Sequence, residues 1–263
     1  MDAVILCGGE GTRIRHLLPE GTPKIMADIE GTPFVDILIQ HILLSGFERL
    51  IFVGGYGCAL LSNHLEKYRD NPNLPSTAKR ILLYWQREPN GTAGAIEFVK
   101  GNLSEDFFVF NGDTFCDVNY KAMFAYHEAT NSTITVACDN QFRHVGTFIA
   151  SQRFIDFIKP LDSGLCKNCR HGWEKHDIDG EFERECLACG DCYDYEFDPK
   201  SKVDMAEVFA LLGQQHEPVG WFMTDAKYWD IGTPENLEAF RNYWAQLPKG
   251  GEGRMIGSDK DAL

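Results

Sequence analysis

The first half of the chain alternates between patterns typical of buried strands and patterns typical of helices. Four short apolar runs predict strands at 2–7, 49–55, 80–86 and 106–113. The segments between them space apolar side chains at the helical period, which predicts helices at 33–46, 59–70 and 92–102. Strands joined through helices form a parallel sheet with right-handed crossovers. The sequence therefore predicts an α/β fold, Rossmann-like and doubly wound, with a mostly parallel sheet and with ligands at the carboxyl ends of the strands.

The same rhythm continues into the second half of the chain. Further helices are expected at 120–130, 153–159, 203–214 and 233–247. Further strands are expected at 132–138 and 144–151. The two runs that follow, 218–224 and 227–232, are expected to form a hairpin.

A polar, cysteine-rich stretch interrupts this rhythm. We therefore expect one main domain over residues 1–160 and 201–247, with an inserted segment at 161–200. Residues 248–263 lack apolar periodicity and are expected to form a disordered tail.

The charge balance excludes some classes of function. The chain of 263 residues has 25 lysines and arginines against 39 aspartates and glutamates, a net charge of −14. Nucleic-acid binders present a basic face, so we expect no nucleic-acid partner. No apolar stretch approaches the roughly 20 residues of a membrane span, and no secretory signal is visible. We expect a cytoplasmic protein with small-molecule partners.

The first strand leads directly into the glycine-rich loop Gly8-Gly9-Glu10-Gly11-Thr12-Arg13. Ile14 stands where a GxGxxG fingerprint would need glycine, and the Gly-Lys-Ser/Thr of a P-loop is absent. Glycines still bring backbone N–H groups close to an anion, and an arginine adds a bidentate phosphate contact. A plain strand-to-helix turn remains the alternative interpretation of this loop alone.

The glycine-rich loop is the first of four motifs that follow one another along the sequence. They are LCGGEGTRIR (6–15) with Pro-Lys at 23–24, EPNGTAGA (88–95), NGD (111–113) and WDIGTP (229–234). Together they resemble the signature of the sugar-1-phosphate nucleotidyltransferase family. The match covers residues 1–160 and 203–245. Within the family, PFVDILIQ…VGGY is similar to the D-glycero-D-manno-heptose 1-phosphate guanylyltransferase type, which is a softer match.

The resemblance implies an enzyme that joins a nucleoside triphosphate to a sugar 1-phosphate and releases pyrophosphate. It implies catalytic roles for Arg13, Lys24, Asp113 and Asp230. The two aspartates are expected to bind Mg²⁺. It implies Gly146 beside the sugar. The nucleotide-binding set that it implies is Leu6, Gly8, Gly9, Gly11, Thr12, Arg13, Glu88, Gly91, Thr92, Ala93 and Gly112.

Several alternatives stay open at this point. The family's F-x-E-K segment of the sugar pocket is missing between TVACDNQF and HVGTFIAS, so the sugar is open. GTP is the first candidate for the nucleotidyl donor, with CTP, UTP and dTTP as alternatives. A non-catalytic nucleotide-sugar sensor is an alternative function. Whether the chain forms a homo-oligomer is also open.

The inserted segment has the cysteine spacing of a zinc site. Cys166-x-x-Cys169 and Cys186-x-x-Cys189 are separated by sixteen residues. Two such turns offer four thiolates, which close a tetrahedron around zinc and leave no open position. The sequence therefore predicts a structural Zn²⁺ in a small ribbon-like insert, with Cys192 as a fifth candidate and free thiols or a redox pair as the alternative.

Overall fold

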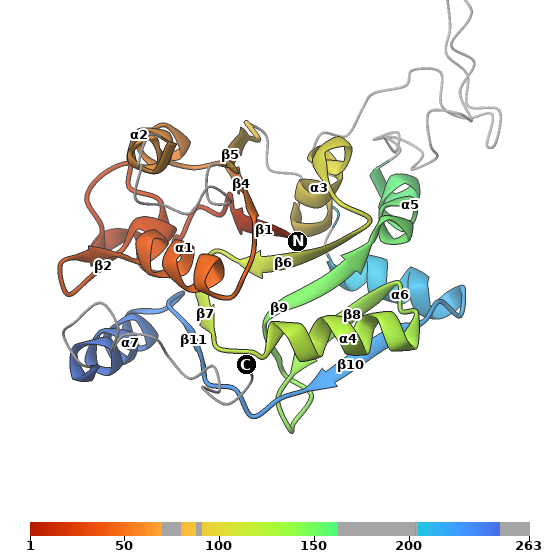
Figure 1. Cartoon of the computed structure of the whole chain (residues 1–263). Helices are drawn as coiled ribbons and strands as arrows, with labels where there is room; N and C mark the ends of the chain where they lie inside the picture. The colour runs from red at the N-terminus through yellow and green to blue at the C-terminus, as the bar shows by residue number, and fades with distance from the viewer. Residues whose placement is uncertain (70–79, 88–90, 163–202, 204, 248–263) are drawn as a thin grey trace, which may run out of the picture.

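The computed structural model describes residues 1–69, 80–87, 91–162, 203 and 205–247. Its centre is a seven-stranded sheet in the order β10-β8-β9-β6-β1-β4-β5 (Figure 1). The strands are β1 (Asp2–Cys7), β4 (Arg49–Gly54), β5 (Arg80–Trp85), β6 (Asp106–Asn111), β8 (Ile134–Cys138), β9 (His144–Ser151) and β10 (Val219–Met223). Only β9 runs against its neighbours in this sheet. The prediction of a mostly parallel sheet is confirmed.

Helices cover both faces of the sheet. They are α1 (Phe34–Leu44), α2 (Cys58–Arg69), α3 (Gly91–Phe98), α4 (Tyr120–Thr130), α5 (Gln152–Asp162), α6 (Met205–Gln214) and α7 (Pro234–Gln246). Buried side chains of α1, α2, α4 and α7 join one apolar cluster, and those of α3, α5 and α6 join the other. The sheet is therefore doubly wound, because its helices divide between the two faces.

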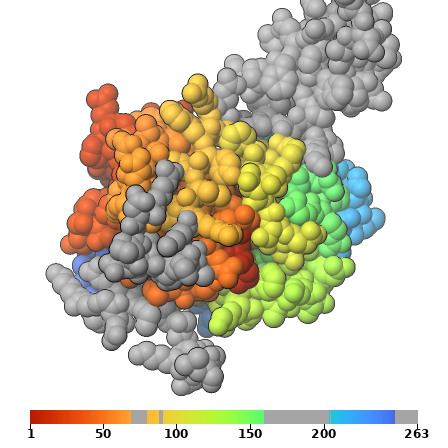
Figure 2. All heavy atoms as spheres, turned by 45° about the horizontal axis from the view of Figure 1, so that its top comes forward, coloured from red at the N-terminus to blue at the C-terminus, as the bar shows by residue number. Residues whose placement is uncertain are grey.

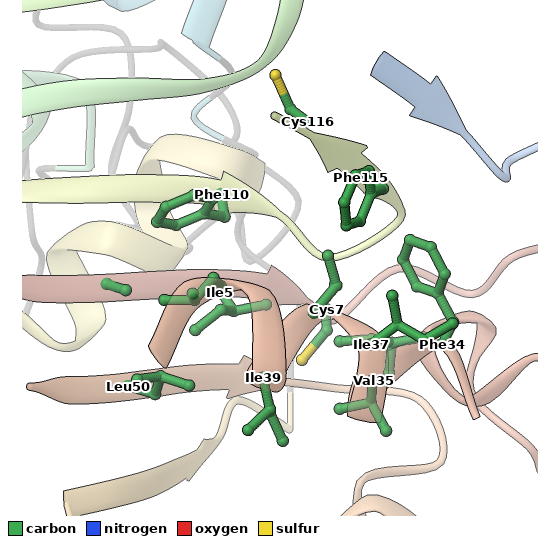
Figure 3. Close-up of a cluster of buried hydrophobic side chains, with 14 of the residues drawn as sticks. Ile5, Cys7, Phe34, Val35, Ile37, Ile39, Leu50, Phe110, Phe115 and Cys116 are labelled. Carbon is green, nitrogen blue, oxygen red and sulfur yellow. The ribbon is translucent and has the colours of Figure 1, made fainter. Parts of the chain in front are cut away.

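The first of these clusters supports the carboxyl end of β1. Figure 3 shows Cys7, at the end of β1, beside Ile37 and Phe34 of α1, and Ile5 belongs to the same cluster. The Sγ of Cys7 lies 3.3 Å from the carbonyl oxygen of Val53, and burial raises the pKa of its thiol. Cys7 is therefore a packed, protonated side chain and not a nucleophile.

Sequence signals at helix ends explain several of these boundaries. The Thr233 hydroxyl accepts a hydrogen bond from the backbone N–H of Asn236, which caps α7 ahead of Pro234. Asn119 caps α4 in the same way through Ala122.

The predicted hairpin of residues 218–232 is wrong. The strand β10 joins the main sheet parallel to β8, whereas β11 (Tyr228–Asp230) pairs antiparallel with β7 (Thr114–Cys116) in a separate small sheet. A third pair is formed by β2 (Asp28–Ile29) and β3 (Thr32–Pro33). The apolar runs at 218–224 and 227–232 correctly indicated two strands. The strands with which they pair are set by tertiary packing.

Some sequence predictions concern residues that the structure does not describe. The helix α5 extends to Asp162, two residues past the expected domain boundary at 160. The rest of the insert, with Cys166, Cys169, Cys186, Cys189 and Cys192, lies outside the described residues, as does the tail from residue 248. Within the described residues, none of the helices has the length and apolar character needed to cross a membrane.

A buried histidine gives the fold a specific pH dependence. The Nε2 of His41 lies 2.9 Å from the carbonyl oxygen of Cys116, and its ring packs against Phe115. Burial outweighs this hydrogen bond and lowers the pKa of His41 to about 4. The folded chain therefore holds His41 neutral under conditions in which the unfolded chain protonates it.

We expect this histidine to destabilise the fold as the pH falls from about 6.5 to about 4. The unfolded state takes up the proton first, at about 6.5, so up to about 3 kcal/mol of stability present at neutral pH is lost over this window. His41→Gln keeps an N–H donor but cannot titrate. Urea unfolding at several pH values should show the wild-type advantage over His41→Gln shrinking from pH 7 to pH 4.5. A constant difference would contradict the assignment.

Candidate functional site

The carboxyl ends of three adjacent strands form the floor of the site. Leu6 of β1 is in register with Val53 of β4 and with Asn111 of β6, so the loops that follow these strands leave the sheet at the same edge. The backbone N–H of Gly112 donates to the carbonyl oxygen of Leu6 across 2.9 Å. Residues from three distant parts of the sequence thus meet at the edge where parallel sheets bind ligands.

The glycine loop after β1 packs against a second glycine loop after β4. The backbone N–H of Tyr56 lies 3.4 Å from the carbonyl oxygen of Gly8. A Cβ at Gly55 would lie only 2.6 Å from that same oxygen, so this approach requires glycine. Gly9, Thr12 and Arg13 are exposed along the same loop. The loop is therefore held at its base, and its middle faces solvent.

Lys24 connects the glycine loop to the end of β6. A Cβ placed on Gly11 would lie 3.1 Å from the Cβ of Lys24, so the lysine stem runs along the loop. The Lys24 ammonium forms an ion pair with the Asp113 carboxylate. Both side chains are only about one-quarter exposed or less, at 20% and 26%. Partial burial strengthens such a pair relative to one on the surface.

Asp113 and Asp230 lie on neighbouring chain segments. Asp230 of β11 is in register with Thr114 of β7, and the backbone N–H of Ile231 donates to the Asp113 carbonyl across 2.8 Å. The Asp230 carboxylate accepts a hydrogen bond of 2.6 Å from the backbone N–H of Gly232. The small β7–β11 sheet thus places Asp113 and Asp230, 117 positions apart in sequence, on adjacent chain segments.

Thr114 links Asp113 to Gly146 of β9. The Thr114 hydroxyl donates to the Asp113 carboxylate across 3.1 Å. Gly146 has φ of +99°, and a Cβ there would lie 2.4 Å from the Thr114 Cγ2. Only glycine combines that backbone conformation with such a close approach. Gly146 therefore packs closely against Thr114, the residue that follows Asp113.

The amino end of α3 carries three residues of the predicted nucleotide-binding set. Gly91, Thr92 and Ala93 open this helix, and the backbone N–H of Ala93 donates to the carbonyl oxygen of Val203 across 3.0 Å. Ala93 belongs to the apolar cluster that also includes Val4 of β1. Val203, the first described residue after the cysteine-rich segment, therefore contacts the end of the helix that was predicted to bind nucleotide.

Short distances and strand pairings connect part of the predicted site. Contacts join Leu6 to Gly112, the glycine loop to Lys24, and Lys24 to Asp113, with Asp230 and Gly146 beside them. Glu88 lies outside the described residues. In the space-filling view, the N-terminal part of the chain, in red and orange, adjoins the middle part, in yellow and green (Figure 2).

Sequence reasoning missed four residues that build this site, namely Arg15, Gly55, Tyr56 and Thr114. Two signals were present in the sequence. A second glycine pair, Gly54-Gly55, ends the second expected strand, and a second arginine stands two positions after Arg13. Thr114 had no comparable signal, because its role arises from the pairing of β7 with β11.

Asp113 and Asp230 have side chains of the type that binds a hard divalent cation. Asp113 and Asp230 offer carboxylate oxygens, which are the ligands that Mg²⁺ prefers. Among the described residues, no group of three or more His, Cys, Asp or Glu side chains could hold one metal ion. Mg²⁺ is commonly bound through one or two carboxylates, with waters and substrate phosphates completing its shell. A pair of carboxylates is therefore a suitable protein donor set.

Comparison with known proteins gives a consistent set of similarities. Residues 2–144, more than half of the chain, match the family described as nucleotidyl transferase. A D-glycero-alpha-D-manno-heptose 1-phosphate guanylyltransferase of Campylobacter jejuni is 30% identical over 149 residues, which cover 56% of this chain and 62% of that protein. The enzyme of the same description from Aneurinibacillus thermoaerophilus is 26% identical over 239 residues, covering 90% of this chain and 95% of that protein.

The fold has close counterparts among solved structures. The crystal structure of HddC from Yersinia pseudotuberculosis superposes with a TM-score of 0.63 at 22% identity. The superposition covers 92% of this chain and 98% of that one. The likeness thus includes the second half of the chain, which the family match at residues 2–144 does not reach.

Proposed function

Since the chain belongs to the nucleotidyl transferase family, we propose that it transfers a nucleotidyl group from a nucleoside triphosphate to a sugar 1-phosphate. The observation that carries this proposal is the continuous set of contacts from the glycine loop through Lys24 to Asp113, with Asp230 on the neighbouring strand. A cradle of N–H groups, two cations and two carboxylates suits a reaction between phosphates.

The proposed reaction needs no protein nucleophile. A phosphate oxygen of the sugar phosphate attacks the α-phosphorus of the triphosphate in line. The bond between the α-phosphorus and the oxygen bridging to the β-phosphorus breaks, and that electron pair leaves with pyrophosphate. No redox change occurs and no external proton is required. Catalysis then consists of orientation and charge neutralisation.

The roles are assigned from the family resemblance, together with the place of each residue in the structure. Arg13, exposed in the loop, is assigned to the β- and γ-phosphates that leave as pyrophosphate. Lys24, partly buried beside Asp113, is assigned to the α-phosphate or the attacking phosphate. Asp113 and Asp230 would hold Mg²⁺, which when bound neutralises phosphate charge as a Lewis acid. Gly146 is assigned to the sugar side, beside Thr114.

The first candidate product is a GDP-heptose-like nucleotide sugar. This choice rests on the similarity to two heptose 1-phosphate guanylyltransferases. Transferases for cytidylyl, uridylyl or thymidylyl groups, and a non-catalytic nucleotide-sugar sensor, are the competing functions. The test is pyrophosphate release from GTP, CTP, UTP and dTTP, each paired with a panel of sugar 1-phosphates. We expect release with at least one pair and fastest release with GTP. Binding without release for every pair would favour the sensor.

We also propose a structural Zn²⁺ at Cys166, Cys169, Cys186 and Cys189. The proposal rests on the paired C-x-x-C spacing. Elemental analysis of freshly purified protein should give about one zinc atom per chain, because a four-cysteine site binds one ion. A zinc content below about half an atom per chain would contradict it.

A further inference from the structure

The glycine loop has a carboxylate where an anion is expected to bind. Glu10 lies between Gly9 and Gly11, and its side chain is 65% exposed. A bare carboxylate at this position would repel a triphosphate, since like charges a few ångströms apart cost about 1 kcal/mol even in bulk water. The net charge of −14 adds to this repulsion. The loop therefore needs a compensating charge.

Arg15 supplies that charge from within the same segment. One guanidinium nitrogen, Nη2, donates to the backbone carbonyl oxygen of Glu10 across 2.9 Å and lies 3.2 Å from its carboxylate oxygen Oε2. The arginine thus binds both the backbone of the loop and its only acidic side chain. This pairing differs from an ordinary surface ion pair because the backbone contact fixes the arginine to the loop.

Arg15 also ties the glycine loop to its neighbour. The guanidinium carbon lies 4.5 Å from the centroid of the Tyr56 ring, a cation–π distance. Tyr56 in turn approaches the carbonyl oxygen of Gly8 through its backbone N–H. The glycine loop is thus held at Gly8 by the β4 loop, and at Glu10 by an arginine that rests on the same β4 loop.

We propose that Arg15 is a positioning residue of the triphosphate site, which neutralises the Glu10 carboxylate and fixes the glycine loop against Tyr56. The inference rests on the proposed function, because it assumes that the loop receives a nucleoside triphosphate. It assigns Arg15 a role different from that of Arg13. Arg15 acts through Glu10, and the phosphates meet the backbone N–H groups and Arg13.

A double-mutant cycle tests this role directly. The measurement is equilibrium binding of GTP with Mg²⁺ to the purified full chain, with no sugar phosphate present. We expect Arg15→Ala to weaken binding about tenfold, because it exposes the Glu10 charge. Glu10→Gln alone should change binding less than about threefold. In the double variant, Glu10→Gln should restore affinity to within about threefold of wild type.

Tyr56 and a distant arginine provide the controls. Tyr56→Leu removes the ring against which the Arg15 guanidinium packs, so it should weaken GTP binding about threefold. Arg153 donates from Nη2 to the backbone and side-chain oxygens of Asn131, at 2.8 and 3.3 Å, in the same manner as Arg15. Arg153→Ala should leave GTP affinity unchanged.

The outcomes separate this inference from the proposed function. If Glu10→Gln fails to restore binding in the Arg15→Ala background, Arg15 contacts the phosphates itself or does not serve the site, and the inference is overturned. If wild type binds GTP but releases no pyrophosphate with any sugar phosphate, the proposed function fails while the positioning role stands. A wild-type chain that binds none of the four triphosphates would overturn both.

Discussion

Asp113→Asn is expected to abolish nearly all turnover while the fold survives. The substitution removes one of two carboxylates proposed to hold Mg²⁺ and also the charge that pairs with Lys24. Loss of one such electrostatic group costs catalysis about 100- to 1,000-fold, and loss of the metal costs more. We therefore expect kcat to fall by at least about 1,000-fold, measured as pyrophosphate release at saturating substrates.

Thermal unfolding separates this effect from misfolding. Asp113 is one-quarter exposed, so the amide should be tolerated with a small change in melting temperature. Asp28→Asn is a matched control, because Asp28 is an exposed aspartate whose carboxylate accepts a hydrogen bond from the backbone N–H of Gly31. A near-normal rate for Asp113→Asn would remove Asp113 from the proposed metal site.

Gly146→Ala is expected to have the largest effect on stability. The new Cβ would lie 2.4 Å from Thr114 Cγ2, and the backbone at φ of +99° disfavours any side chain. Overpacking costs about 1–3 kcal/mol and the strained backbone costs a similar amount. We expect a loss of about 2–5 kcal/mol in the free energy of unfolding, and a fall in turnover because Thr114 contacts Asp113.

Two further variants test the cause of that loss. Gly213→Ala lies in α6, where a Cβ meets nothing within 4 Å, so it should be neutral or slightly stabilising. Thr114→Ser removes the clashing methyl group and keeps the hydroxyl, so it should recover part of the stability lost in Gly146→Ala. Equal stabilities of Gly146→Ala and Gly213→Ala in urea unfolding would contradict the packing argument.

The layout of the sheet could be predicted because its signals are local. Each strand of the first half is an apolar run, and some helices begin or end at residues that favour a helix terminus. Gly46 follows α1 with φ of +90°, a conformation that favours glycine, and Thr233 caps α7. These choices depend on a few adjacent residues, so the sequence alone reveals them.

The pairings that complete the site could not be predicted in the same way. The pair of β7 with β11 joins residues more than 100 positions apart, and nothing in either three-residue strand specifies the other. The false hairpin at 218–232 has the same origin, because β10 pairs with β8 instead of with its neighbour in sequence. The family resemblance predicted roles for Lys24, Asp113 and Asp230. The roles of Thr114, Gly55 and Arg15 follow from contacts that only the structure shows.

The most direct test of nucleotidyl transfer follows the α-phosphorus itself. The purified chain is incubated with Mg²⁺, α-³²P-labelled GTP and D-glycero-α-D-manno-heptose 1-phosphate, and the products are separated. We expect the label to pass into a nucleotide sugar, formed in equal amount to unlabelled pyrophosphate. Other sugar 1-phosphates and triphosphates, labelled in the same way, extend the test to the alternative substrates. If no label enters a sugar-bearing product with any of them, the chain is not a sugar-1-phosphate nucleotidyltransferase.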